Sequence, residues 1–95
     1  LKTAKVVACE NLAGSDKLLK LTVKVGQETR TIVSGIRDSY MAEEMVGKTV
    51  VIVANLKPAK LRGTLSEGMI LAVGEGKNIS LVCPEKDMPD GEVVR

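Results

Sequence analysis

Apolar and polar residues follow one another in short runs that predict a chain rich in β-strands. Residues 4–12 (AKVVACENL) contain several β-branched side chains and end at the turn signal AGSD, which predicts a first strand. From Leu19 to Val25 (LKLTVKV), leucine and valine alternate with lysine and threonine. A period of two is typical of a strand with one buried face. After the turn GQE, residues 29–36 (TRTIVSGI) are expected to return as its antiparallel partner.

The second half of the chain changes period once and then returns to strands. Residues 39–46 carry methionine and valine at helical spacing before a glycine, which predicts a short helix or 3₁₀ turn. Residues 48–56 (KTVVIVANL) predict a strand buried on both faces. Residues 68–84 predict two short strands around the turn GEGKN. Residues 85–94 predict a loop that closes on a short final strand.

This order of elements favours an all-β fold. Several short strands, one small helix between strands 3 and 4, and only 95 residues are typical of a five-stranded Greek-key barrel of the OB type. A β-sandwich needs about seven strands, for which the chain is too short. We expect one domain over residues 1–95, with residues 84–95 as a C-terminal extension.

One connection is longer than the others and carries charge. Residues 54–69 (ANLKPAKLRGTLSEGM), here called the bridge, exceed the usual connection of about 4–6 residues. In an OB barrel, the loop between strands 4 and 5 flanks the face that binds oligonucleotides. We therefore expect Lys57, Lys60 and Arg62 to contact phosphates, and Ser66 to donate a hydrogen bond to a phosphate or sugar. The residues alone also allow a solvated turn, with Met69 in the core.

Composition limits the function further. Residues 1–83 hold 12 Lys and Arg against 8 Asp and Glu, while residues 84–95 hold 2 against 4, so the body is mildly basic and the tail acidic. Such a distribution suits a face that meets a polyanion. Tyr40 is the only aromatic residue, and binding to single strands by stacking needs more. Nucleic-acid binding would therefore rest on phosphate contacts, on shape and on an aliphatic wedge.

Other function classes find no support in the residues. The chain has no histidine, and no spacing typical of a catalytic residue, a metal site or a cofactor site. No apolar run approaches the roughly 20 residues that cross a membrane. Cys9 and Cys83 are far apart without a CxxC pattern, and we expect two buried, reduced thiols in a cytoplasmic protein.

Several segments together resemble a known family. DKLLKLTVKVG, RTIVSGI, the whole of YMAEEMVGKTVVIVANLKPAKLRGTLSEGMILA and PDGEVV are similar to the tRNA-binding domain at the C-terminus of many bacterial methionyl-tRNA synthetases. Related domains occur as a free-standing tRNA-binding protein and in the endothelial-monocyte-activating-polypeptide-like (EMAP-II-like) domains of eukaryotic synthetase complexes. The most specific part is NLKP-K-RG--S-GM, within the bridge.

The resemblance implies an OB-fold core that binds tRNA by its shape and backbone, has no catalytic activity, and assists an attached or associated synthetase in aminoacylation. It also implies a homodimer in the cytoplasm, without a cofactor. The residues at the family's tRNA-facing positions are Lys57, Lys60, Arg62, Ser66 and Met69. Asn55 is expected to brace the bridge, and Lys17 and Arg30 to extend the basic surface.

Two alternatives remain at this stage. One is a protein-interaction or dimerisation module of the same fold, in which the bridge and the apolar Met41, Met45 and Met88 dock a partner. The other is a general single-strand binder, which the shortage of aromatic residues makes the weaker choice.

Overall fold

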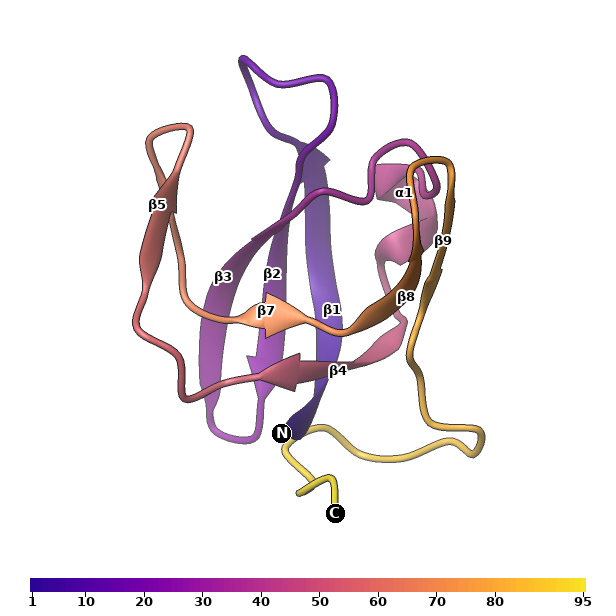
Figure 1. Cartoon of the computed structure of the whole chain (residues 1–95). Helices are drawn as coiled ribbons and strands as arrows, with labels where there is room; N and C mark the ends of the chain where they lie inside the picture. The colour runs from indigo at the N-terminus through magenta and orange to yellow at the C-terminus, as the bar shows by residue number, and fades with distance from the viewer.

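A curled antiparallel sheet forms the body of the molecule, and short hairpins extend from it (Figure 1). The computed structural model describes residues 1–95. The strands are β1 (Lys2–Asn11), β2 (Leu19–Val25), β3 (Glu28–Ser34), β4 (Thr49–Val53), β5 (Ala59–Leu61), β6 (Thr64–Ser66), β7 (Met69–Ile70), β8 (Ala72–Glu75) and β9 (Asn78–Leu81). The one helix, α1 (Ala42–Met45), lies between β3 and β4. No helix therefore has the length and hydrophobicity that a membrane crossing requires.

The main sheet has five strands in the order β3-β2-β1-β4-β7, all antiparallel to their neighbours. β1 is long enough to pair with β2 along most of its length and with β4 at its start. Its register against β2 shifts between Val6 and Ala8, and such an irregularity bends a strand. The bend lets one strand serve both halves of a curled sheet. The predicted OB-like, five-stranded all-β fold with one short helix is confirmed.

The hydrophobic pattern of the sequence places the core correctly. In β2, Leu19, Leu21, Val23 and Val25 are buried while the residues between them are exposed or half-buried. The middle of β4 is buried, as expected for an apolar strand that is covered on both faces. The helix contributes Met45, which is fully buried. Apart from Val51, on the other face of β4, these side chains form one contiguous cluster inside the curled sheet.

Two parts of the chain differ from the expectation. The bridge is not an irregular loop, because β5 and β6 pair within it as a hairpin of their own. Residues 85–94 do not end in a strand: only an isolated pairing joins Val93 to Lys2. Backbone hydrogen bonds of Gly91 and Glu92 with Thr3, and of Val94 with Leu1, hold this tail, and the Thr3 side chain adds two more. The Thr3 hydroxyl donates to the carbonyl of Pro89 (2.8 Å) and accepts from the N–H of Glu92 (2.9 Å).

Asp90 fastens the tail to the turn between β2 and β3. Its carboxylate accepts a hydrogen bond from the N–H of Gly26 at 2.6 Å and lies 3.4 Å from the ammonium of Lys24. The bond from Gly26, followed by the charge of Lys24, outweighs partial burial and holds the pKa of Asp90 below its ordinary value. Because the folded pKa is lowered, this contact contributes stability at neutral pH and loses it as the pH falls through that pKa.

Both cysteines are free thiols. Cys9 is half-buried, whereas Cys83 is exposed, so the expectation that both are buried is wrong for Cys83. Burial, together with the charges of Glu10 and Glu43, raises the pKa of Cys9 to about 11. The Cys9 thiol therefore stays protonated at neutral pH.

Candidate nucleic-acid interface

The β5–β6 hairpin projects beyond the edge of the main sheet, and its tip lies at the same end of the molecule as the β1–β2 loop (Figure 1). Ala59 pairs with Ser66, Lys60 with Leu65, and Leu61 with Thr64. The two-residue turn is Arg62-Gly63, and both residues have positive φ (49° and 81°). Positive φ at both central positions is the requirement of a type I′ turn, which matches the twist of the flanking strands.

The three cations of the bridge stand in solvent. Lys57 precedes the hairpin, Lys60 lies on β5, and Arg62 occupies the tip; all three are exposed. None of them forms an ion pair, since the three salt bridges of the chain lie elsewhere. Unpaired, exposed cations on a projecting hairpin are available for an anionic ligand.

Apolar side chains accompany these cations. Met69, at the start of β7, is 53% exposed, which shows that it is not part of the core. Leu56, Leu61 and Leu65 are also exposed. The surface therefore offers aliphatic contacts beside its positive charges, without any aromatic ring.

Lys17 is exposed in the β1–β2 loop. Hydrogen bonds with neighbouring residues hold this loop in place. The N–H of Lys17 donates to the hydroxyl of Ser15 (3.2 Å), and the guanidinium of Arg37 donates to the carbonyl of Ser15 (2.5 Å). The backbone N–H of Arg37 also donates to the carbonyl of Lys17 (3.3 Å). Arg37 was not singled out from the sequence as a residue that supports this loop. Its position directly after a buried isoleucine was the feature of the sequence that could have indicated this role.

Ser66 and Arg30 do not lie as the sequence suggested. Ser66 is only 4% exposed; its hydroxyl accepts from the N–H of Val33 (2.9 Å) and donates to the carbonyl of Gly68 (3.1 Å). The Arg30 side chain is 24% exposed and forms an ion pair with Glu28 at 2.8 Å. Both side chains are thus engaged within the fold rather than presented on the basic surface.

Asn55 is exposed directly after β4. The hydrogen bond that anchors this end of the bridge comes from the guanidinium of Arg30 to the carbonyl of Ala54. The bracing role expected of Asn55 is therefore filled by Arg30, and the Asn55 side chain is left facing solvent.

Comparison with known proteins agrees with this geometry. Residues 1–93 match the family described as "Putative tRNA binding domain". The chain belongs to the tRNA-binding domain family. The domain is 60% identical, over its full length, to a part of the methionine–tRNA ligase of Deinococcus radiodurans. It spans 14% of the length of that ligase.

Solved structures share the fold. A methionyl-tRNA-synthetase-related protein from Pyrococcus horikoshii has a TM-score of 0.88 and 37% identity, and the match covers 96% of the domain and 84% of that protein. The chaperone CsaA from Bacillus anthracis has a TM-score of 0.85 at 24% identity, covering 95% and 84% of the two chains. This second likeness concerns the fold alone.

Proposed function

We propose that this tRNA-binding domain is a non-catalytic module that recognises the folded shape of tRNA and assists aminoacylation, as the C-terminal domain of a bacterial methionyl-tRNA synthetase. The observation that carries the proposal is the bridge, with its projecting β5–β6 hairpin and its three exposed, unpaired cations. The match to a part of a methionine–tRNA ligase supports the assignment to that enzyme. The cytoplasm, where tRNA is aminoacylated, is the compartment we propose.

The proposed contacts come from two loops. Lys57, Lys60 and Arg62 meet phosphates from the bridge, and Lys17 meets them from the β1–β2 loop. Met69 contacts a sugar or base edge as an aliphatic wedge, and Asn55 offers a polar contact beside it. With a single aromatic residue in the chain, affinity rests on the neutralisation of phosphates and the release of counterions.

The module would act on the encounter of enzyme and tRNA rather than on the chemical step. Added phosphate contacts lengthen the time that tRNA spends bound near the catalytic body of the enzyme. They stabilise the ground state and the transition state equally. Such uniform binding lowers the apparent KM for tRNA and leaves kcat unchanged.

Filter binding of tRNA over a series of salt concentrations tests the proposal. The logarithm of the affinity should fall with the logarithm of the salt concentration, with a slope near −0.7 to −0.9 for each phosphate neutralised. A variant with Lys57→Ala, Lys60→Ala and Arg62→Asn should lose about 2.1–2.7 units of slope, for three phosphates, and roughly 100-fold in affinity at low salt. Asparagine is chosen at position 62 because it favours the type I′ turn.

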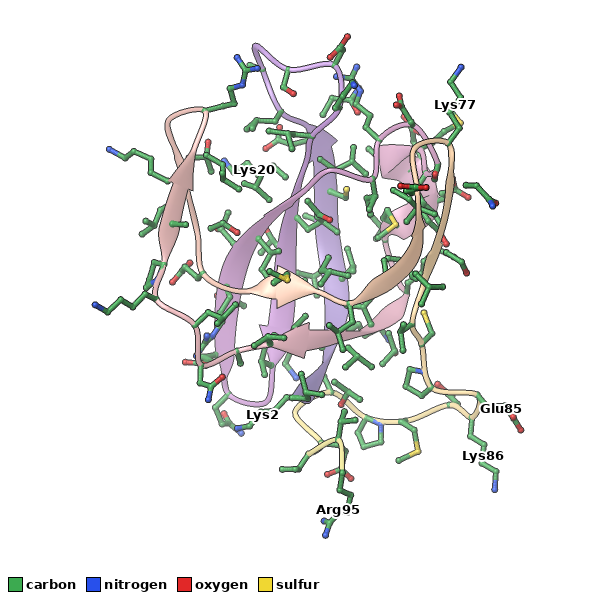
Figure 2. The ribbon with its side chains drawn as sticks, in the orientation of Figure 1. Lys2, Lys20, Lys77, Glu85, Lys86 and Arg95 are labelled. Carbon is green, nitrogen blue, oxygen red and sulfur yellow. The ribbon has the colours of Figure 1, made fainter.

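A matched control removes three cations elsewhere. Lys77, Lys86 and Arg95 lie away from β5 (Figure 2), and their replacement by alanine changes the net charge by the same amount. The control variant should bind tRNA nearly as wild type does. Affinity that does not depend on salt, or equal losses in the two triple variants, would refute the proposed interface.

The homodimer implied by the resemblance is also a proposal, and an apolar surface at the tail supports it. Val51, Val82, Met88 and Val93 line a cavity of about 310 Å³ beside the C-terminal tail. Light scattering over a range of protein concentrations should show a dimer. If instead the bridge variant loses self-association and keeps its affinity for tRNA, the bridge is a protein-interaction surface.

The structure excludes one of the methionines expected to dock a partner in the protein-interaction alternative. Met45, expected to dock a partner, is fully buried in the core, while Met41 and Met88 are exposed. The partner-binding surface would therefore have to form without Met45.

A further inference from the structure

Arg30 points toward the interior of the curled sheet, although it is charged. It pairs across the strands with Val23, and Ile32, two residues later on β3, pairs with Leu21. Val23, Leu21 and Ile32 are fully buried. Since alternate residues of a strand share a face, Arg30 lies on the buried face of β3, near its end. Its guanidinium reaches the open edge of the barrel rather than the outer surface.

The guanidinium holds both ends of the bridge at once. Its Nη1 donates to the carbonyl of Ala54, which follows β4, and to the carbonyl of Glu67, which follows β6 (3.1 Å). Its Nε and Nη2 lie 2.9 Å and 2.8 Å from one carboxylate oxygen of Glu28. The positive charge is thus already paired, and all three nitrogens of the guanidinium are engaged, so a phosphate would have to compete with Glu28 for it.

Two neighbouring side chains complete the junction between β3 and the bridge. The Glu67 carboxylate accepts from the N–H of Thr31 (3.0 Å), and the N–H of Glu67 donates to the carbonyl of Thr31 (2.7 Å). Ser66 accepts from the N–H of Val33. Side chains of the bridge therefore satisfy the backbone donors along the outer edge of β3, where a regular sixth strand is missing.

We infer that Arg30, Ser66 and Glu67, together called the clasp, are positioning residues that fix the direction of the β5–β6 hairpin and thereby its preference for folded tRNA over single-stranded RNA. This inference rests on the proposed function. Cations on a loose loop can follow any flexible phosphate chain. Cations on a hairpin fixed at its base have a set spacing and direction, which favours a ligand with a rigid backbone, because less freedom is lost on binding.

The mechanical part can be tested without RNA, by amide hydrogen exchange in the 95-residue chain. In Arg30→Gln and Ser66→Ala, the amides of β5 and β6 should exchange faster, while those of β8 and β9 keep their wild-type rates. Ser66→Ala removes no charge and serves as the second variant if Arg30→Gln does not fold. Lys86→Gln, which makes the same charge change as Arg30→Gln at an exposed site, should leave exchange in the hairpin unchanged. Unchanged exchange in both clasp variants would overturn the inference.

The recognition part uses the same variants with tRNA and with poly-U. The ratio of the affinity for tRNA to that for poly-U should fall by roughly tenfold in the clasp variants, with the salt slope unchanged. A slope reduced by about 0.7–0.9 in Arg30→Gln would mean that Arg30 contacts a phosphate itself, and equal losses for both RNAs would indicate general destabilisation; either result overturns the inference. A wild type that binds neither RNA would overturn the proposed function, while the exchange experiment still decides whether the clasp holds the hairpin.

Discussion

The β5–β6 and β8–β9 hairpins have similar form but are attached to the molecule in different ways. β9 is held along its length: the N–H groups of Ile79 and Leu81 donate to the hydroxyls of Ser39 (3.1 Å) and Tyr40 (3.0 Å). The β5–β6 hairpin is held only at its base, by the clasp; the first strand of each hairpin, β5 or β8, is exposed throughout, so the difference lies in the second strand. A hairpin fixed along its side is part of the scaffold, whereas one fixed at its base can present both faces to a ligand.

The two hairpins also differ in charge and in turn geometry. The bridge has three cations before its first carboxylate, Glu67, while the β8–β9 hairpin balances Glu75 against Lys77. At the tips, Arg62 has positive φ but Lys77 does not. An arginine in the left-handed region costs roughly 1–2 kcal/mol relative to an ordinary conformation. Arg62 at one tip is therefore strained, whereas Lys77 at the other tip is not. This difference indicates that the choice of residue at position 62 reflects more than local stability.

The largest effect on stability is expected from the glycines of the two hairpins. A Cβ at Gly74 would lie 2.0 Å from the carbonyl oxygen of Asn78, whereas a Cβ at Gly63 would meet nothing within 4 Å. Gly74→Ala should therefore lower the free energy of unfolding by about 2–4 kcal/mol, through both overlap and positive φ. Gly63→Ala should cost only about 1–2 kcal/mol.

Urea denaturation followed by filter binding checks this pair. The affinity of folded Gly74→Ala for tRNA should stay within about twofold of wild type, since β8–β9 carries no proposed contact. A large loss of affinity in this variant would mean that the second hairpin also belongs to the interface.

The next prediction tests whether Met69 is a residue that contacts tRNA or a residue of the core. Met69→Ala should leave the free energy of unfolding within about 0.5 kcal/mol of wild type, as expected of an exposed side chain. Its affinity for tRNA should fall by roughly tenfold, which corresponds to the loss of about 1.5 kcal/mol of apolar contact. Val73→Ala, at an exposed position on β8, is the matched control for the affinity. Thermal unfolding and filter binding give the two quantities, and a stability loss without an affinity loss would assign Met69 to packing.

Tyr40→Phe tests the anchoring of β8–β9. The variant removes the hydroxyl that accepts from Leu81, so the free energy of unfolding should fall by about 1 kcal/mol. For a chain of this size, that corresponds to a decrease of about 4–8 °C in the melting temperature. Scanning calorimetry measures it. An unchanged melting temperature would show that the backbone pairing alone holds this hairpin.

The smallest effect is expected at the tip of the bridge. Arg62→Asn relieves the positive-φ strain and should raise the free energy of unfolding by up to about 1 kcal/mol. The same change removes one phosphate contact, so the salt slope for tRNA binding should decrease by about 0.7–0.9. Lys77→Asn, at the other tip, should change neither quantity. A stabilised Arg62→Asn variant with an unchanged slope would remove Arg62 from the interface.

Several features of the fold could be predicted because they depend on local pattern. The alternation of Leu19 to Val25 and the apolar run of β4 each reflect the face that the strand buries. The β5–β6 hairpin could not be predicted in this way. Its strands have three residues each, and Arg-Gly is a weaker turn signal than Asn-Gly. Pairing there depends on the attachment of both ends of the bridge to β3, which a local pattern does not contain.

The features of the candidate site can be separated in the same way, into those that depend on local pattern and those that depend on the tertiary structure. By itself, the sequence determined where the cations of the bridge lie along the chain, that Tyr40 is the only ring, and the family to which the chain is similar, because these are properties of residue order. Only the tertiary structure decided that Met69 is exposed while Ser66 and Arg30 act within the fold. Their roles depend on backbone groups of Val33, Ala54 and Glu67, all of which are far away along the chain from the side chains they bind. A hydrogen bond between such distant residues exists only after the sheet has curled.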